Sequence, residues 1–286
     1  MYETAAIRDL VWALQSPPMF LHRTAVRPDW GKLEVERNRG LLSRLDQPNS
    51  SLQRAVSRRS TNRLGEYFEI LLRTWTDEIP PARLLGAGVQ VNGSGGTVGE
   101  FDLLFARDGA VHHWELAVKY YLGYPGESGP VWYGPDPRDV LGEKWKKMRR
   151  QQLRLSQDPL GRQALRRLGI RDHVQPRAFV KGYLFEALNP NFRTHDHPHA
   201  NPDASRGFWV HRVDLAEHRP RVPAGTRWLR LGRLRWMAPV VVSDDEQLFE
   251  LDELVAQFPD EALFVAGVHE GEELARGFIV DDCWPK

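Results

Sequence analysis

Residues 97–122, TVGEFDLLFARDGAVHHWELAVKYYL, decide the fold class of this chain. The stretches 97–106 and 110–122 are rich in β-branched and aromatic residues, and Arg-Asp-Gly at 107–109 forms a tight turn between them. The pattern predicts two antiparallel strands joined by a short connection. An apolar stretch at 84–91 precedes Asn-Gly-Ser-Gly-Gly, so we expect a third strand in the same meander.

Helical patterns lie on both sides of this meander. Residues 4–15 and 61–78 place apolar side chains on one face, and prolines follow both segments. Residues 138–168 predict a long basic helix that is interrupted near its Asp-Pro pair. Beyond it, 178–188 predicts a strand and 244–258 a helix. The alternation of strands and helices indicates an α/β protein.

The remaining stretches are less regular. We expect polar connecting segments at 31–60 and a loop at 123–137, which is rich in Gly and Pro. The later part of the chain predicts further strands, including Ala-Pro-Val-Val-Val at 238–242. A domain boundary near 176 divides the chain into 1–176 and 177–286. The second part could equally complete the first domain, because the strand predicted at its start could join the first sheet.

Composition excludes several classes of protein. The chain has 286 residues, of which 41% are hydrophobic, and it contains 39 basic and 38 acidic residues. The single Cys283 excludes a disulfide framework and a cysteine zinc finger, and it fits the reducing cytoplasm. No apolar run reaches the length of a membrane span, and Glu3 and Asp9 make the start unlike a signal peptide. We therefore expect a cytoplasmic protein without a membrane partner.

The two strands of 97–122 carry the residues with the clearest chemistry. Strand side chains alternate between faces, so Glu100 and Asp102 share one face, as do Glu115 and Lys119. Fixed carboxylate oxygens suit Mg²⁺ or Mn²⁺, and an ammonium group beside them suits attack of water on phosphorus. A structural ion pair between Glu115 and Lys119 is the simpler alternative.

An acidic helix followed by a strand with Asp, a turn, and a strand with Glu and Lys resembles the PD-(D/E)xK nuclease superfamily. The segments TVGEFDLL…HWELAVKYYLG and YGPDPRDVLGEKWKKM resemble sequences of the bacterial DUF1853 family, which has no assigned function. The resemblance implies a restriction-endonuclease-like core, with a mixed central sheet flanked by helices, in 1–176. A C-terminal α+β extension would follow in 177–286.

The resemblance also implies roles for individual residues. Asp102, Glu115 and Lys119 match the superfamily's catalytic acids and lysine, and Glu66 matches an acid of the preceding helix. Asp102, Glu115 and Glu66 would then hold Mg²⁺ or Mn²⁺. One departure is that acid and lysine usually lie two residues apart, whereas the position two before Lys119 is Ala117, which cannot bind a metal.

The basic segment provides a candidate surface for nucleic acid. Between Arg138 and Arg171 the chain has eleven Lys or Arg and three acids, although its overall charge is near zero. Clustered cations attract a phosphate backbone without reading its sequence. The simpler alternative is a solvated helix face. The residues that we expect to contact nucleic acid are Lys144, Lys147, Arg150, Gln151 and Gln152.

Together these patterns predict a divalent-metal-dependent phosphodiesterase or nuclease that acts on nucleic acid. The main alternative is a catalytically inactive module with the nuclease fold, which binds nucleic acid or a protein partner. A hydrolase of small phosphoesters is a third class. Substrate, strandedness and oligomeric state do not follow from the sequence.

Overall fold

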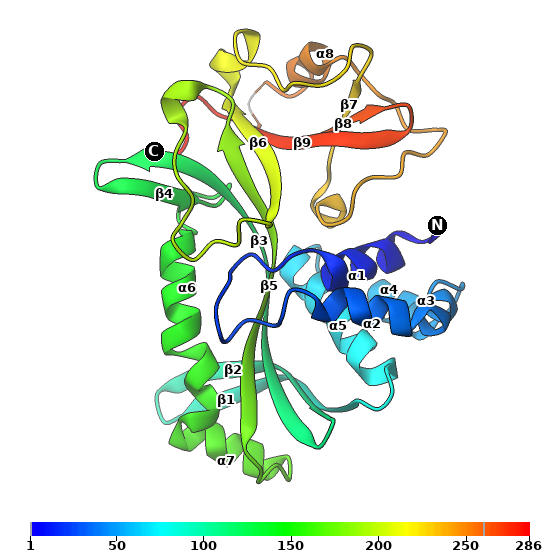
Figure 1. Ribbon diagram of the computed structural model, residues 1–286, viewed down its shortest axis with the longest axis vertical. Helices are drawn as coiled ribbons and strands as arrows, with labels where there is room; N and C mark the ends of the chain where they lie inside the picture. The colour runs from blue at the N-terminus through cyan, green and yellow to red at the C-terminus, as the bar shows by residue number, and fades with distance from the viewer. Residues whose placement is uncertain (1, 260) are drawn as a thin grey trace. The chain divides into compact units, whose positions relative to one another are not determined.

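The computed structural model describes residues 2–259 and 261–286. Its α-helices are α1 (Ala5–Gln15), α2 (Trp30–Arg37), α3 (Arg39–Leu45), α4 (Ser51–Ser57), α5 (Leu64–Glu78), α6 (Leu141–Arg150), α7 (Pro159–Arg167) and α8 (Leu251–Ala256). Its strands are β1 (Arg83–Gly93), β2 (Gly96–Arg107), β3 (Ala110–Gly126), β4 (Gly129–Tyr133), β5 (Val174–Ala187), β6 (Ser205–His211), β7 (Arg227–Arg230), β8 (Leu263–His269) and β9 (Glu272–Val280). Figure 1 labels these elements.

The strands of the described residues form a mixed sheet of nine strands in the order β1-β2-β3-β5-β6-β9-β8-β7, with β4 paired to β3. Strands β1, β2, β3 and β4 pair antiparallel in succession, whereas β6 lies parallel to both β5 and β9. Helices flank this sheet, so the expected α/β class with a mixed sheet is confirmed. No helix of the described residues is both long and apolar enough to cross a membrane.

The chain divides into two compact units, and each consists of two segments. The first unit contains the residues up to Val118 together with Lys144–Lys181, and the second contains Lys119–Glu143 together with Gly182–Lys286. Long strands β3 and β5 contribute to both units, because each passes from one to the other along its length. The expected boundary between residues 176 and 177 falls inside β5.

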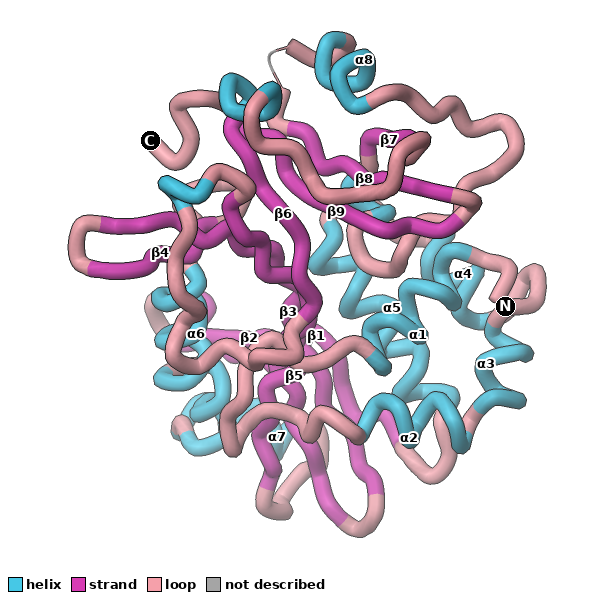
Figure 2. The backbone as a smooth tube through the Cα atoms, turned by 45° about the horizontal axis from the view of Figure 1, so that its top comes forward, coloured by secondary structure: helices cyan, strands magenta, loops and turns pink. Residues whose placement is uncertain are grey.

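In the first unit, helices cover both faces of the sheet. On one face, a core cluster contains Phe101 and Leu104 of β2 and Leu165 of α7. On the other, Phe179 of β5 stacks on Trp114 of β3 at a centroid distance of 5.0 Å. Helices α1–α5 lie on one side of β1 and β2, with α6 and α7 on the opposite side (Figure 2). The candidate residues of this unit therefore lie between packed layers.

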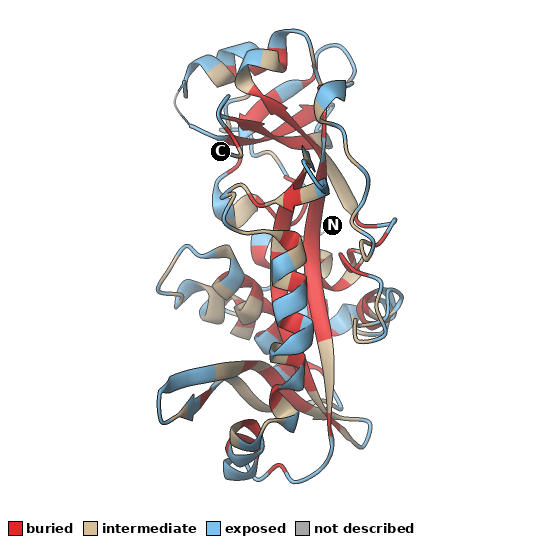
Figure 3. Ribbon diagram, turned by 90° about the vertical axis from the view of Figure 1, so that its left-hand side faces the viewer, coloured by how far each residue is buried: buried red, intermediate tan, exposed pale blue. Residues whose placement is uncertain are grey.

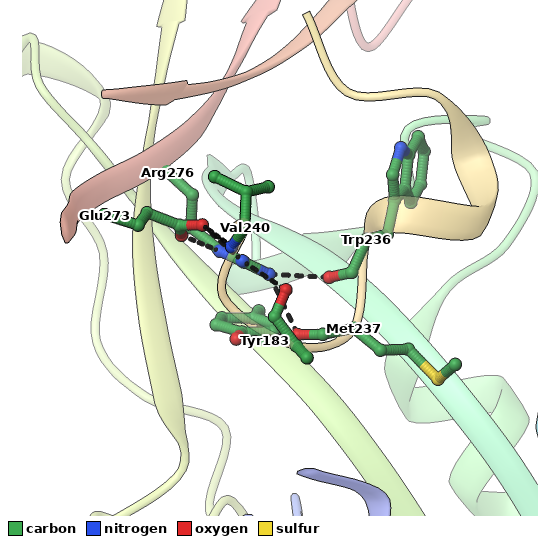
Figure 4. A network of polar contacts seen from close by, with 7 residues as sticks. Tyr183, Trp236, Met237, Val240, Glu273 and Arg276 are labelled. Atoms are coloured by element: carbon green, nitrogen blue, oxygen red, sulfur yellow. Dashed lines mark hydrogen bonds and ion pairs between the residues drawn. The ribbon is translucent and has the colours of Figure 1, made fainter. Parts of the chain in front are cut away.

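In the second unit, a buried arginine organises the segment after β7. Arg276 of β9 is 4% exposed and donates hydrogen bonds to the carbonyls of Trp236, Met237 and Ala238. Its guanidinium also pairs with Glu273 at 2.5 Å (Figure 4). Buried charges are stable only when they are paired and hydrogen-bonded, and this arginine meets both conditions. Arg276 thus fixes a segment that has no regular secondary structure.

Several expectations differ from the structure. Residues 31–60, expected as polar connections, contain most of α2 and all of α3 and α4. Within 123–137, expected as a loop, β3 continues to Gly126 and β4 returns along it as a hairpin. Ala-Pro-Val-Val-Val at 238–242 forms no strand, because the backbone at its start is bound by Arg276. The elements at 4–15, 61–78, 84–91 and 97–122 are confirmed.

Candidate functional site

Asp102 lies where strands β2 and β3 stop pairing. Their antiparallel ladder runs from Arg107 opposite Ala110 to Leu103 opposite Trp114. One residue further, the Asp102 Oδ2 atom accepts a hydrogen bond from the Leu116 amide at 2.8 Å. The side chain thereby satisfies a backbone donor that the neighbouring strand does not reach. This contact fixes the carboxylate at the point where the two strands separate.

Glu115 is fully buried one residue before that amide. Its Oε1 atom lies 2.6 Å from the Nε2 atom of His113, and its Oε2 atom accepts a hydrogen bond of 2.6 Å from Gln152. Burial raises the pKa of Glu115 to about 8, although the positive charge of Lys144 opposes the shift. Burial also lowers the pKa of His113 to about 4. Near neutral pH, the pair is therefore an uncharged imidazole beside a carboxyl group that holds a proton.

Four acids of the first unit, Glu69, Glu100, Asp102 and Glu115, interact electrostatically with one another. Burial and the charge of Glu115 raise the pKa of Asp102 to about 7. Burial, Asp102 and Glu100 raise the pKa of Glu69 to about 7. Like charges in a poorly hydrated site oppose ionisation, so these carboxyl groups carry a cost whenever they are all charged. Crowding of this kind is common at functional sites.

These oxygens are the donors that Mg²⁺ and Mn²⁺ prefer. Among the residues that the structure describes, no three His, Cys, Asp or Glu side chains are arranged so that they could hold a metal ion. The type of donor fits such an ion, and the carboxyl groups are close enough to shift one another's pKa. Their oxygens would nevertheless have to turn toward a common point.

We expected Glu66 of helix α5 to join the acids of β2 and β3. The acid of α5 whose pKa they shift is instead Glu69. Glu66 lies in the first turn of α5 and accepts hydrogen bonds from the hydroxyls of Ser60 and Thr61. Glu69, almost one turn later, has Asp102 as its main charged neighbour. Sequence reasoning missed Glu69, although three residues is the spacing that brings side chains to one helix face. The phrase GEYFE carries both acids and could have identified it.

Lys119 belongs to the second unit, and its ammonium has a partner there. Its Nζ atom lies 2.5 Å from the Asp139 Oδ2 atom, and the Tyr121 hydroxyl donates to the Asp139 Oδ1 atom at 3.0 Å. Burial and the charge of Asp139 raise the pKa of Tyr121. The sequence did not single out Asp139, which lies in the segment before α6. Lys119 is thus held in a polar cluster of its own unit.

Most of the residues expected to contact nucleic acid line one groove of the first unit. The groove has a volume of about 880 Å³, and residues 97–100 at the start of β2 form one of its walls. Of the five expected residues, four contribute to its lining: Lys147, Arg150, Gln151 and Gln152. Lys144 does not line it, although its charge acts on Glu115. We call this feature the first groove; Glu100 lines it together with Arg154.

Gln152 connects this groove to the buried acids. It lines the first groove, and its amide nitrogen donates to Glu115. Glu100 lines the same groove, and its charge raises the pKa of Asp102, Glu69 and Glu115. The acidic group and the basic wall of the first groove are therefore neighbours within one unit.

Comparisons with known proteins identify a family and no nearer relative. A family model described as a domain of unknown function, DUF1853, matches residues 8–280. No curated protein and no solved structure matches the chain. Since the matched region contains both units apart from their terminal residues, the chain belongs to the DUF1853 family.

Proposed function

We propose that the first unit is a divalent-metal-dependent phosphodiesterase that acts on nucleic acid. The observation that carries this proposal is the crowding of Glu69, Glu100, Asp102 and Glu115 beside a groove with a cationic wall. Partial burial and like charges favour the protonated forms of these acids in the absence of a metal, and a bound dication would favour their ionised forms. Phosphate groups would in turn be attracted to the lysine and arginines of the groove.

Each residue would have a distinct task. Asp102 and Glu115 would hold the ion, with Glu69 adding an oxygen from α5 in place of the expected Glu66. When bound, Mg²⁺ or Mn²⁺ supplies a Lewis acid for the phosphoryl oxygen and lowers the pKa of its water. The Leu116 amide orients Asp102.

Two further residues would position Glu115 from either side. His113 contacts its Oε1 atom and Gln152 its Oε2 atom, so both partners influence the orientation of the carboxyl group. Partners behind a metal ligand commonly set its orientation and basicity. The polar groups of the first groove would then bind the phosphates on either side of the one that reacts.

The test is cleavage of labelled DNA and RNA, single- and double-stranded, in Mg²⁺ or Mn²⁺ and in EDTA. We expect Asp102→Ala and Glu115→Gln to reduce metal-dependent cleavage by about 10²-fold or more. Asp77→Ala, an exposed acid of α5, is the matched control and should leave the rate unchanged. Cleavage that survives both substitutions would contradict the proposal. Lys119→Met, tested alongside, decides whether the lysine takes part in the reaction.

A catalytically inactive binding module is the second candidate. Other groups of the same chain already contact both oxygens of Glu115 and one oxygen of Asp102, and Lys119 is paired with Asp139. Together with Ala117 in place of the usual acid, these contacts favour a nuclease fold that binds without cleaving. Binding of nucleic acid in EDTA, with no cleavage in any metal, would establish this alternative.

A further inference from the structure

A second groove lies on α7, next to the first. It has a volume of about 630 Å³, and its lining includes Arg162 and Arg166 of α7 together with Arg171 and His173. Gln157 lines both grooves, so they meet at this residue. All four basic side chains belong to exposed residues, and the exposed outer surfaces of α6 and α7 are visible in Figure 3. We call this feature the α7 groove.

The arginines of the α7 groove lack acidic partners. In the described chain, no carboxylate lies within ion-pair distance of Arg162, Arg166 or Arg171. Arg162 donates a hydrogen bond to the backbone carbonyl of Gln157 at 2.6 Å. Asp172 also lines the groove, so three arginines and one aspartate give it a net charge of +2 with His173 neutral.

Several exposed arginines of the second unit, in contrast, have carboxylate partners. Exposed arginines there form ion pairs, for example Arg219 with Asp252 at 2.6 Å and Arg227 with Glu250 at 2.8 Å. Arg230 pairs in the same way with a glutamate at 2.5 Å. The α7 groove differs because three exposed arginines, for which the described residues provide no carboxylate partner, lie together in one lining. Concentrated and uncompensated positive charge is the electrostatic mark of a surface that binds a polyanion.

The N-terminus of α7 is not the source of this attraction. Asp158 caps the helix, and its Oδ1 atom accepts hydrogen bonds from the amides of Leu160 and Gly161. These backbone donors are satisfied, and the capping charge is negative. Any anion at the α7 groove is therefore bound by side chains, and its attraction depends on the number of cations.

We infer that the α7 groove is a second phosphate-binding track, continuous past Gln157 with the first groove, and that it binds the extension of the same nucleic acid. This inference rests on the proposed function and adds a binding site beyond the reacting phosphate. With nine residues, α7 is about 13.5 Å long at about 1.5 Å per residue. That length spans about four phosphates of one strand at about 3.4 Å each.

The test measures binding in EDTA, so that cleavage plays no part. Fluorescence anisotropy with a labelled DNA of about 30 nucleotides, single-stranded and duplex, is recorded between about 50 and 200 mM KCl. The variant is R162Q/R166Q/R171Q. The matched control is R219Q/R227Q/R230Q, which changes the net charge equally at exposed residues of the second unit. Thermal melts by circular dichroism establish that both variants are folded.

We expect the α7 variant to bind at least about tenfold more weakly at about 100 mM salt, because each lost phosphate contact costs about eightfold there. The slope of log K against log salt should fall by about two to three. The control should stay within about twofold of the wild type. Equal affinities and slopes for the α7 variant and the wild type would overturn the inference, as would a wild type that does not bind in EDTA.

Two further measurements separate this inference from the proposed function. Metal-dependent cleavage of short oligonucleotides by the α7 variant, at saturating concentration, should persist, because the acids are intact. If cleavage persists and binding of long DNA is unchanged, only the α7 track is wrong. If polyglutamate of equal charge displaces DNA more effectively than unlabelled DNA does, the groove binds an acidic protein and the inference is wrong.

Discussion

Replacement of Asp102 by Asn should make the protein more stable in alkali while it removes metal binding. The carboxyl group has a folded-state pKa of about 7, against 3.8 for an ordinary Asp, because it is buried and close to Glu115. Between these two values the folded state binds a proton that the unfolded state releases. Stability from this group is therefore fully present below about pH 4 and is lost as the pH rises through 7.

The size of this change in stability follows from the shift in the pKa of Asp102. Each pKa unit corresponds to about 1.36 kcal/mol, so about three units amount to about 4 kcal/mol over the whole range. About 3 kcal/mol of this falls between pH 5 and pH 8.5, and partial solvation of the site reduces it to about 2–3 kcal/mol. Asn cannot ionise, and its amide oxygen can still accept from Leu116 at a cost of about 1 kcal/mol for the weaker hydrogen bond.

Urea unfolding in EDTA at pH 5 and at pH 8.5 measures this difference. Relative to the wild type, Asp102→Asn should gain about 2–3 kcal/mol of unfolding free energy between the two pH values. Asp77→Asn, an exposed acid of α5, should follow the wild type at both. Mn²⁺ should stabilise the wild type and leave Asp102→Asn unaffected. Parallel pH dependence of wild type and Asp102→Asn would refute the argument that Asp102 is destabilised by its surroundings.

Two further predictions concern Glu69 and the buried arginine of the second unit. Glu69→Gln should weaken Mn²⁺ binding by about 10–100-fold in calorimetry, whereas Glu66→Gln should change it little, because hydroxyl groups of the preceding turn already bind Glu66. Arg276→Met should lower the unfolding free energy by about 3–5 kcal/mol in urea, since it leaves Glu273 buried without its partner. R276M/E273Q should cost less than the two single changes added together; a purely additive result would show that the pair does not act as a unit.

Regular periodicity explains which parts of the fold were predictable. Helix α5 and strands β1, β2 and β3 follow local patterns that are long enough to distinguish a helix from a strand. The three short helices within 31–60 were missed, because seven or eight residues carry too little of a helical period. Strand β9 was missed for another reason, since its buried Arg276 makes the stretch look exposed.

The candidate site was predictable only where it lies along the two strands of the β2–β3 hairpin. Asp102 and Glu115 could be identified from alternation, and the structure makes Glu115 the partner of Gln152, which was expected nearer the phosphate backbone. No local pattern marks His113 as a partner of Glu115, although it contacts Glu115 directly. Contacts such as these depend on how α5 and the segment after α6 pack on the sheet, and no local pattern encodes that packing.

The charge balance of 39 basic and 38 acidic residues conceals two opposite excesses within the first unit. Acids of α5, β2 and β3 raise one another's pKa, and arginines without a carboxylate partner among the described residues line the α7 groove. If the two sets served only stability, we would expect them to pair with each other, as Arg219 and Arg227 of the second unit pair with carboxylates. A protein partner with one sign of charge would satisfy only one of the two sets. A dication together with a phosphate backbone would satisfy both, which is why the proposed function accounts for the acids and the arginines with a single ligand complex.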